Sequence, residues 1–330
     1  MSRPLMFGKQ CKDERAWTAC TIDTPTSWYY TLSKDSHFAF EALIKSLQHD
    51  SRTGTEISIK EPLFDTQLES DISMRSACQE CLEPIQNALN AGRGFAIIEP
   101  VSIESATVRE KKAIYWVIGQ FLGTPFAQNI EGTLLYDVRD TGRDVAKGAR
   151  FSVTNADSSF HVDGAFADPM PDIVGLLCLR TAKSGGRSQL ISAYAIHNEL
   201  FGTYPDVLET LYGLFYFDRR GQFKQGDAPT CQFPIFHWED QRLIMRYLHY
   251  YIKVGHNQVG QPLTPKQEKA LKVLQMMLQR PDFRIEFSLK PGQMLFTNNR
   301  WILHNRTEFE DYLDPNLRRY YIRLWLKDRS

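Results

Sequence analysis

The stretch Phe160-His161-Val162-Asp163-Gly164 decides how this chain is interpreted, because it places an imidazole and a carboxylate two residues apart. The surrounding run is typical of a β-strand, in which residues i and i+2 face the same side. His161 and Asp163 are therefore candidate metal ligands. Alone, such a pair is more often hydrogen-bonded than metal-bound. A metal site needs a third ligand from elsewhere in the chain.

The third candidate ligand is His304, which lies in the stretch 294–306 where a predicted strand ends. Two histidines and one carboxylate on one face of a metal leave the opposite face open. Iron(II) oxygenases need this arrangement, because co-substrate and oxygen must bind the same metal. The three residues together therefore indicate an iron site.

A strand rich in arginine follows at residues 318–326. Alternation places Ile322, Leu324 and Leu326 on one face, and turns Arg319, Tyr321 and Arg323 to the other. Two guanidinium groups that face a barrel interior are costly unless anions pair with them. A dicarboxylate such as 2-oxoglutarate would supply one such anion. The alternative is a solvated edge strand.

These motifs carry a family resemblance, which extends from about residue 92 to residue 326. The chain resembles the TauD/TfdA (taurine dioxygenase-like) family of iron(II)- and 2-oxoglutarate-dependent oxygenases, within the clavaminate synthase-like superfamily. The matching motifs are His161-x-Asp163, Gly185-Gly186-x-Ser188, Pro291-Gly292-Gln293-Met294-Leu295-Phe296, and His304 followed by Arg319.

The resemblance implies a role for each matching residue. In such enzymes the His-x-Asp pair and the distal histidine bind iron(II), which here are His161, Asp163 and His304. It implies that Arg319 binds the far carboxylate of 2-oxoglutarate and that Ser188 assists, where taurine dioxygenase has threonine. Arg318 competes with Arg319 for this role, although alternation turns it to the other face. Arg323 resembles the position that meets the anionic end of the substrate.

The fold that we expect is mainly β with flanking helices, a double-stranded β-helix (jelly roll, cupin-like) of about eight strands. Residues 1–90 form a lead-in whose helices pack on the core. Residues 91–330 form the oxygenase core, with an insertion at about 193–280, all in a single structural domain. Periodicity and turn signals predict helices at about 33–48, 68–91, 103–122, 193–214 (broken by Pro205) and 265–278, and strands at 95–98, 133–138, 150–153, 173–179, 188–192, 215–217, 233–236, 243–247, 283–289, 293–297, 302–304 and 320–326.

The expected reaction is oxidation of an unactivated carbon of a small molecule, with 2-oxoglutarate converted to succinate and CO2. Candidate substrates are an amino acid, another carboxylate or an intermediate of secondary metabolism. Related halogenating enzymes replace the carboxylate with a small residue, so Asp163 favours hydroxylation. A desaturase or ring-forming oxidase with the same cofactors (iron(II), 2-oxoglutarate and O2) is one alternative. A non-catalytic jelly-roll binding protein is the other.

The amino-acid composition narrows the range of possible binding partners. The 330 residues carry 39 basic and 39 acidic side chains, so no excess charge favours nucleic acid. We find no stretch of 18 apolar residues and no signal peptide, and therefore expect a cytoplasmic protein without membrane contact. Six cysteines in so long a chain suit a reducing compartment. The sequence leaves a homo-oligomer open.

Other metal-binding residue types have simpler interpretations. Cys78 and Cys81 have the spacing of half a zinc site, but no second half follows and the pair lies in a helical pattern. Four further histidines have no partner at ligand spacing, and we interpret them as structural, or at most as pocket lining: His197, His237, His249 and His256.

Overall fold

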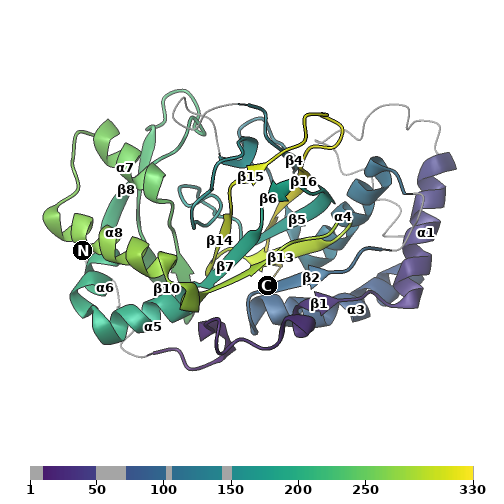
Figure 1. Ribbon diagram of the computed structural model, residues 1–330, viewed down its shortest axis with the longest axis horizontal. Helices are drawn as coiled ribbons and strands as arrows, with labels where there is room; N and C mark the ends of the chain where they lie inside the picture. The colour runs from purple at the N-terminus through teal and green to yellow at the C-terminus, as the bar shows by residue number, and fades with distance from the viewer. Residues whose placement is uncertain (1–9, 50–71, 102–105, 143–150, 330) are drawn as a thin grey trace.

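Strands from the first half, the middle and the end of the chain build the main sheet of the computed structural model, which describes residues 10–49, 72–101, 106–142 and 151–329 (Figure 1). Within these residues the sheet has seven strands, antiparallel except for the parallel pair β1–β2. Its path is β1 (Tyr29–Tyr30), β2 (Phe95–Ile98), β13 (Met294–Asn298), β5 (Ile173–Arg180), β16 (Tyr320–Lys327) and β3 (Thr124–Pro125), and β4 (Leu135–Val138) also pairs with β16.

A smaller antiparallel sheet provides the opposite wall. In the described part of the chain it consists of β12 (Arg284–Phe287), β7 (Ser188–Ser192) and β14 (Ile302–Arg306), with β7 in the centre. Side chains from both sheets line one pocket, including Leu176 and Leu295 from the main sheet and Leu190 from the smaller one. Three two-stranded antiparallel sheets lie outside these two sheets: β6 (Ser184–Gly185) with β15 (Phe309–Glu310), β8 (Leu214–Asp218) with β9 (Thr230–Pro234), and β10 (Phe236–Glu239) with β11 (Arg242–Met245).

Helices flank the strands in two groups (Figure 1). One group covers the main sheet: α1 (Lys34–His49), α3 (Ile72–Asn90) and α4 (Val108–Leu122). The other lies at the opposite end of the molecule: α5 (Ala193–Thr203), α6 (Pro205–Leu211), α7 (His249–Gln258) and α8 (Pro265–Gln279). No helix among the described residues is both long and apolar enough to cross a bilayer.

Capping residues explain where two of these helices begin. Thr107 accepts a hydrogen bond from the Glu110 amide at 3.3 Å, and the Glu110 carboxylate accepts one from the Thr107 amide at 2.6 Å. This reciprocal capping box satisfies two amides that α4 itself leaves unpaired. Thr264 and Gln267 do the same for α8, and Pro265 occupies the first helical position.

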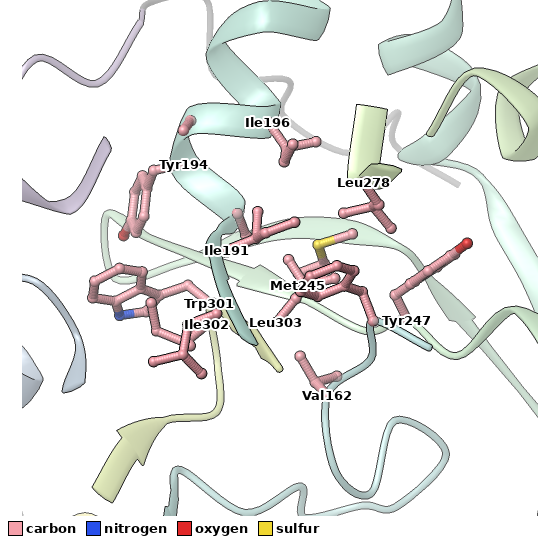
Figure 2. Close-up of a cluster of buried hydrophobic side chains, with 14 of the residues drawn as sticks. Val162, Ile191, Tyr194, Ile196, Met245, Tyr247, Leu278, Trp301, Ile302 and Leu303 are labelled. Atoms are coloured by element: carbon pink, nitrogen blue, oxygen red, sulfur yellow. The ribbon is translucent and has the colours of Figure 1, made fainter. Parts of the chain in front are cut away.

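The core lies on both sides of the main sheet. Alternation along β16 turns Ile322 and Leu324 toward α4, while Arg323 faces the pocket. A second cluster joins the smaller sheet to α5 and α8 (Figure 2). In that cluster Val162, the residue between two of the candidate ligands, points toward Leu303 and Tyr247. The core therefore anchors the chain beside the predicted site.

The expected fold class, mainly β with flanking helices, is confirmed, but one predicted strand is wrong and one helix was not predicted. Residues 150–153 were expected to form a strand; residue 150 lies outside the described residues, and Phe151–Val153 form a 3-10 turn that pairs with no strand in the described part of the chain. Helix α7 was not predicted, because its aromatic and β-branched residues have low helix propensity. Close packing of α7 on β8 compensates for this low propensity. Gly255 approaches β8 so closely that a Cβ on it would lie 2.7 Å from the backbone of Phe217.

Candidate metal centre and its pocket

The structure brings His161, Asp163 and His304 together, although 141 positions separate the last two. Each offers one ligand atom, and these atoms all lie within 4.8 Å of one another. Asp163 Oδ1 is 3.6 Å from His161 Nε2 and 3.7 Å from His304 Nε2. Two imidazoles and one carboxylate directed at a common point form a set that can hold a divalent metal and leave positions open.

The backbone beneath this cluster differs from the predicted strand. His161 and His304 form an isolated antiparallel bridge, with N–H···O=C distances of 3.1 and 2.9 Å. After His161 the chain enters a turn at Asp163 and Gly164. The expectation that His161 and Asp163 share one face of a strand is therefore wrong, and the turn brings the carboxylate to the imidazoles.

Asn299 holds this turn in place. Its side-chain oxygen accepts a hydrogen bond from the Asp163 amide at 2.8 Å. Its amide nitrogen donates to the carbonyl of Asp163 at 2.9 Å and to that of Pro171 at 3.0 Å. The residue is fully buried. Asn299 was not predicted as a site residue, although Asn side chains often replace backbone pairing in turns.

Ser159 orients the first histidine. Its carbonyl oxygen lies 2.8 Å from His161 Nδ1, which directs Nε2 toward the cluster. Ser159 has φ = 56°, a left-handed conformation that is uncommon outside glycine. The Asp157 carboxylate supports it by accepting a hydrogen bond from the Ser159 amide at 2.7 Å. The segment Asp157-Ser158-Ser159 carried a turn signal that sequence reasoning did not use.

Asp163 is held ionised by its neighbours. Trp325 Nε1 donates to Oδ2 at 2.9 Å, and an Arg323 Nη lies 3.1 Å from the same oxygen. Burial opposes ionisation, but Arg323 and the two histidines together hold the pKa of Asp163 well below its usual range. Burial and the nearby His161 lower the pKa of His304. A neutral imidazole and an ionised carboxylate are the forms that bind metal.

Arg319 lies in the same pocket as the cluster, as does Ser188 at the start of β7. The Arg319 side chain is buried, and its Nε has no hydrogen-bond partner among the described residues. Its guanidinium stacks on the Tyr321 ring at 3.9 Å. Gly186, with φ = 66°, leaves room beside it, because a Cβ there would lie 3.4 Å from Nε. An unpaired buried donor in a pocket is suited to an anionic ligand.

Two other arginines behave differently. Arg318 donates to the carbonyl oxygens of Tyr312 and Leu313 and does not belong to the pocket lining of the described structure. Arg306, which was not predicted as a site residue, lines the pocket. Burial and the neighbouring Arg319 lower the pKa of Arg306 to about 9.

Arg323 belongs to the other side of the pocket. Its Nε donates to Gln128 Oε1 at 2.8 Å, and Gln128 in turn donates to the Arg323 carbonyl at 2.9 Å. The guanidinium lies over the rings of Tyr136 and Trp325, 5.0 and 5.1 Å from their centroids. Gln128 thus fixes the arginine that was predicted to meet the substrate.

The remaining histidines and the cysteine pair lie apart from this pocket. His197 bonds the Tyr212 hydroxyl at 2.8 Å, and burial lowers its pKa to about 4. His256 bonds the Gln261 carbonyl at 2.7 Å. None of the four histidines set aside as structural lines the pocket in the described residues. Cys78 and Cys81 lie on α3, and burial raises the pKa of Cys78 to about 12.

Comparisons with known proteins show the family to which the chain belongs. Residues 60–325 match the family model described as taurine catabolism dioxygenase TauD, TfdA family. FR-33289 synthase of Streptomyces rubellomurinus is 28% identical over 315 residues, which are 94% of this chain and 88% of that protein. Uridine-5'-phosphate dioxygenase of Amycolatopsis sp is 30% identical over 190 residues, 57% of this chain and 66% of that protein.

Solved structures share the fold. Non-heme iron oxygenase OrfP, solved with Fe and alpha-ketoglutaric acid, superposes with a TM-score of 0.66 at 16% identity, covering 92% of this chain and 94% of that one. Asparagine oxygenase, solved with Fe(II), a hydroxyasparagine and succinate, gives a TM-score of 0.63 at 18% identity, covering 91% and 93%.

The chain belongs to the TauD/TfdA family, because the family model matches most of its length. The predicted membership is therefore confirmed. Membership makes the protein an oxidoreductase of the dioxygenase class that uses iron(II), 2-oxoglutarate and O2, as the motifs indicated.

Proposed function

We propose that this protein hydroxylates an unactivated carbon of a small molecule that bears an acidic group. His161, Asp163 and His304 bind iron(II), and Arg319 with Ser188 binds the far carboxylate of 2-oxoglutarate. The observation that carries the proposal is the shared pocket: the three ligand residues line the same cavity as the buried Arg319, whose Nε has no hydrogen-bond partner among the described residues. One end of that cavity suits a metal and the other an anion.

The residues around the metal prepare the site for binding. Trp325 donates to Oδ2 of Asp163, and Arg323 Nη1 lies 3.1 Å from Oδ2 and donates to Oδ1 at 3.3 Å. Oδ1 also lies 3.6 and 3.7 Å from the Nε2 atoms of His161 and His304. Iron(II), with 2-oxoglutarate and O2, supplies the oxidising power to break a C–H bond, and 2-oxoglutarate becomes succinate and CO2. Apolar side chains exclude water around the reacting carbon and line the remaining wall: Val174, Leu176, Leu190, Leu248 and Leu295.

Arg323 is the residue that we propose meets the acidic group of the substrate. It lines the pocket beside the metal cluster and is held there by Gln128. A guanidinium has five N–H donors, and the bonds of Arg323 to Gln128 and Asp163 leave others for a ligand. One relative, uridine-5'-phosphate dioxygenase, is named for a substrate that bears an anionic group. An amino acid, another carboxylate or a natural-product intermediate would fit this requirement.

A turnover screen tests the proposal. Purified protein with iron(II), O2 and 2-oxoglutarate is offered amino acids, betaines, sulfonates and natural-product intermediates, and succinate and product mass are measured. We expect substrate-dependent succinate and a product heavier by one oxygen atom. A product lighter by two hydrogens would identify a desaturase or ring-forming oxidase instead. Absence of succinate with every compound, and in the uncoupled reaction, would favour a binding protein without catalysis.

The cellular setting stays a prediction. All six cysteines are free, which supports the cytoplasmic location that we propose. The expected partner is the small-molecule substrate rather than nucleic acid or a membrane, and a homo-oligomer stays open. Size-exclusion chromatography with light scattering would measure the oligomeric state.

A further inference from the structure

Arg306 occupies a position that the proposed roles leave unexplained. On β14 it is the direct antiparallel partner of Ser188 on β7. Directly opposed residues on one face of a sheet have their Cβ atoms about 4.5–5.5 Å apart. Both residues line the pocket together with Arg319. Arg306 therefore lies beside the residues that are proposed to hold the far carboxylate of 2-oxoglutarate.

The distance between Arg306 and the candidate metal ligand His304 also suits a role in binding the far carboxylate. Arg306 follows His304 by two residues on the same strand, so both side chains face the pocket. Two residues of a strand span roughly 6.4–6.8 Å. That length is comparable to an extended five-carbon diacid. A 2-oxo acid bound at the His304 end would thus place its far carboxylate near Arg306.

The pocket also has unbalanced charge at this end. Arg306 and Arg319 both lie near the Phe309 ring, 4.7 and 5.3 Å from its centroid. Carboxylates interact with both groups, Asp157 and Asp140 with Arg306 and Asp311 with Arg319, but neither guanidinium forms a direct ion pair with any residue that the structure describes. Arg323, in contrast, pairs with Asp163 at 3.1 Å. Burying a cation without a counter-charge is costly. A carboxylate that enters between these groups would offset the cost of both.

Arg306 is held in place but retains free donors. Its Nη1 donates to the carbonyl of Thr154 at 3.0 Å, and its Nη2 donates to the carbonyl of Ala156. These two bonds use two of the five N–H groups of the guanidinium. The bonds fix the side chain against the segment that leads to His161, and the other N–H groups are available to a ligand.

We propose that Arg306 is a second cationic residue of the co-substrate site, which binds the far carboxylate of 2-oxoglutarate together with Arg319. The inference rests on the proposed function. A carboxylate has about four lone-pair positions, enough to accept from two guanidiniums and the Ser188 hydroxyl. Arg306 then helps the enzyme to select a dicarboxylic 2-oxo acid over a monocarboxylic one.

The test compares two 2-oxo acids of equal chain length. Iron(II)-loaded protein is titrated without oxygen with 2-oxoglutarate, or with 2-oxopentanoate, which has a methyl group in place of the far carboxylate. The visible charge-transfer absorption of the iron–oxo acid chelate reports binding. We expect Arg306→Gln to raise the Kd for 2-oxoglutarate about tenfold or more. The Kd for 2-oxopentanoate should change less than about twofold, and Arg306→Lys should retain most of the affinity for 2-oxoglutarate.

The possible outcomes distinguish an effect of the Arg306 charge on co-substrate binding from an effect of its hydrogen bonds to Thr154 and Ala156. If Arg306→Gln weakens both acids equally, or neither, the proposal is wrong, because the far carboxylate then does not meet this side chain. If Arg306→Gln fails to fold, Arg306→Lys decides: a tenfold loss for both acids would overturn the proposal. Arg319→Gln is the reference for loss of the carboxylate site. If the wild-type protein shows no chelate absorption with either acid, the proposed function itself fails.

Discussion

At the metal centre, Asn299 fixes Asp163 in the way that strand pairing fixes His304. Its three hydrogen bonds join the backbone on both sides of the Asp163 turn to that of Pro171. Asn298 provides a matched contrast. It is also buried, but it donates to the Leu89 carbonyl and accepts from the Arg300 amide, away from the metal ligands.

We predict that Asn299→Ala weakens iron(II) binding about 10–100-fold, because the carboxylate loses its fixed position. Asn298→Ala should lower stability without changing metal affinity by more than about threefold. Competition with a colorimetric iron chelator measures the affinity, and thermal unfolding measures the stability. Equal metal affinities in the two variants would show that Asn299 has only a structural role.

Site residues that belong to a sequence motif could be predicted. Residues that support them through hydrogen bonds over a long sequence separation could not. The candidates His161, Asp163, His304, Ser188 and Arg319 were identified from short motifs, and the structure brings them to one pocket. The supporting contacts of Asn299 and Trp325 with Asp163 cross 136 and 162 positions. No spacing rule connects residues so far apart, so such contacts appear only when the chain is folded.

At the scale of elements, the turn at Gly185-Gly186 sets the shape of the co-substrate end of the pocket. Gly185 has φ = 72°, and a Cβ on it would lie 2.2 Å from the carbonyl oxygen of Glu308. The short pair of β6 with β15 depends on this close approach, and it places Phe309 beside Arg319. Gly226 has φ = 95° but nothing within 4 Å of its ideal Cβ.

Gly185→Ala should therefore destabilise the protein more than Gly226→Ala. The second change costs about 1–2 kcal/mol from left-handed backbone strain alone. The first adds a clash with backbone that no side-chain rotation relieves, and we expect a further loss of about 2 kcal/mol or more. Urea denaturation followed by circular dichroism measures both. Similar losses in the two variants would mean that the turn relaxes and that the close approach is unimportant.

Most strands could be predicted because their apolar runs are buried in the sheets. Ile173–Arg180, Ser188–Ser192 and Met294–Asn298 illustrate this, since nearly every residue in each is buried. The strand prediction for residues 150–153 was wrong, because a short segment becomes a strand only when a neighbouring strand pairs with it. Helix α7 was missed because contact with β8 outweighs its weak propensity.

At the scale of the whole molecule, stability depends on the layer between the main sheet and its helices. Phe296 on β13 is fully buried in this layer and packs on the Tyr115 ring of α4, with 5.7 Å between centroids. We expect Phe296→Ala to lower the free energy of unfolding by about 3–5 kcal/mol. Phe38 on α1 is 66% exposed, so Phe38→Ala should stay within about 0.5 kcal/mol of wild type. Equal effects in urea denaturation would contradict this account of the core.

We also propose that the chain folds as a single domain with its insertion. Both core clusters contain residues of the main sheet, such as Leu295 in one and Phe296 in the other. Elements that share a sheet are expected to unfold together. Differential scanning calorimetry should show one transition, and two well-separated transitions would divide the chain into independent units.

The central claim is that the three ligands and the arginine pocket form one working oxygenase site. The most direct measurement is 2-oxoglutarate consumption by the purified protein and by the variants His161→Ala and Asp163→Ala, with and without iron(II) and oxygen. We predict succinate formation only when wild-type protein, iron(II) and oxygen are all present, and loss of turnover in both variants. Full turnover by either variant would contradict the assignment of the site.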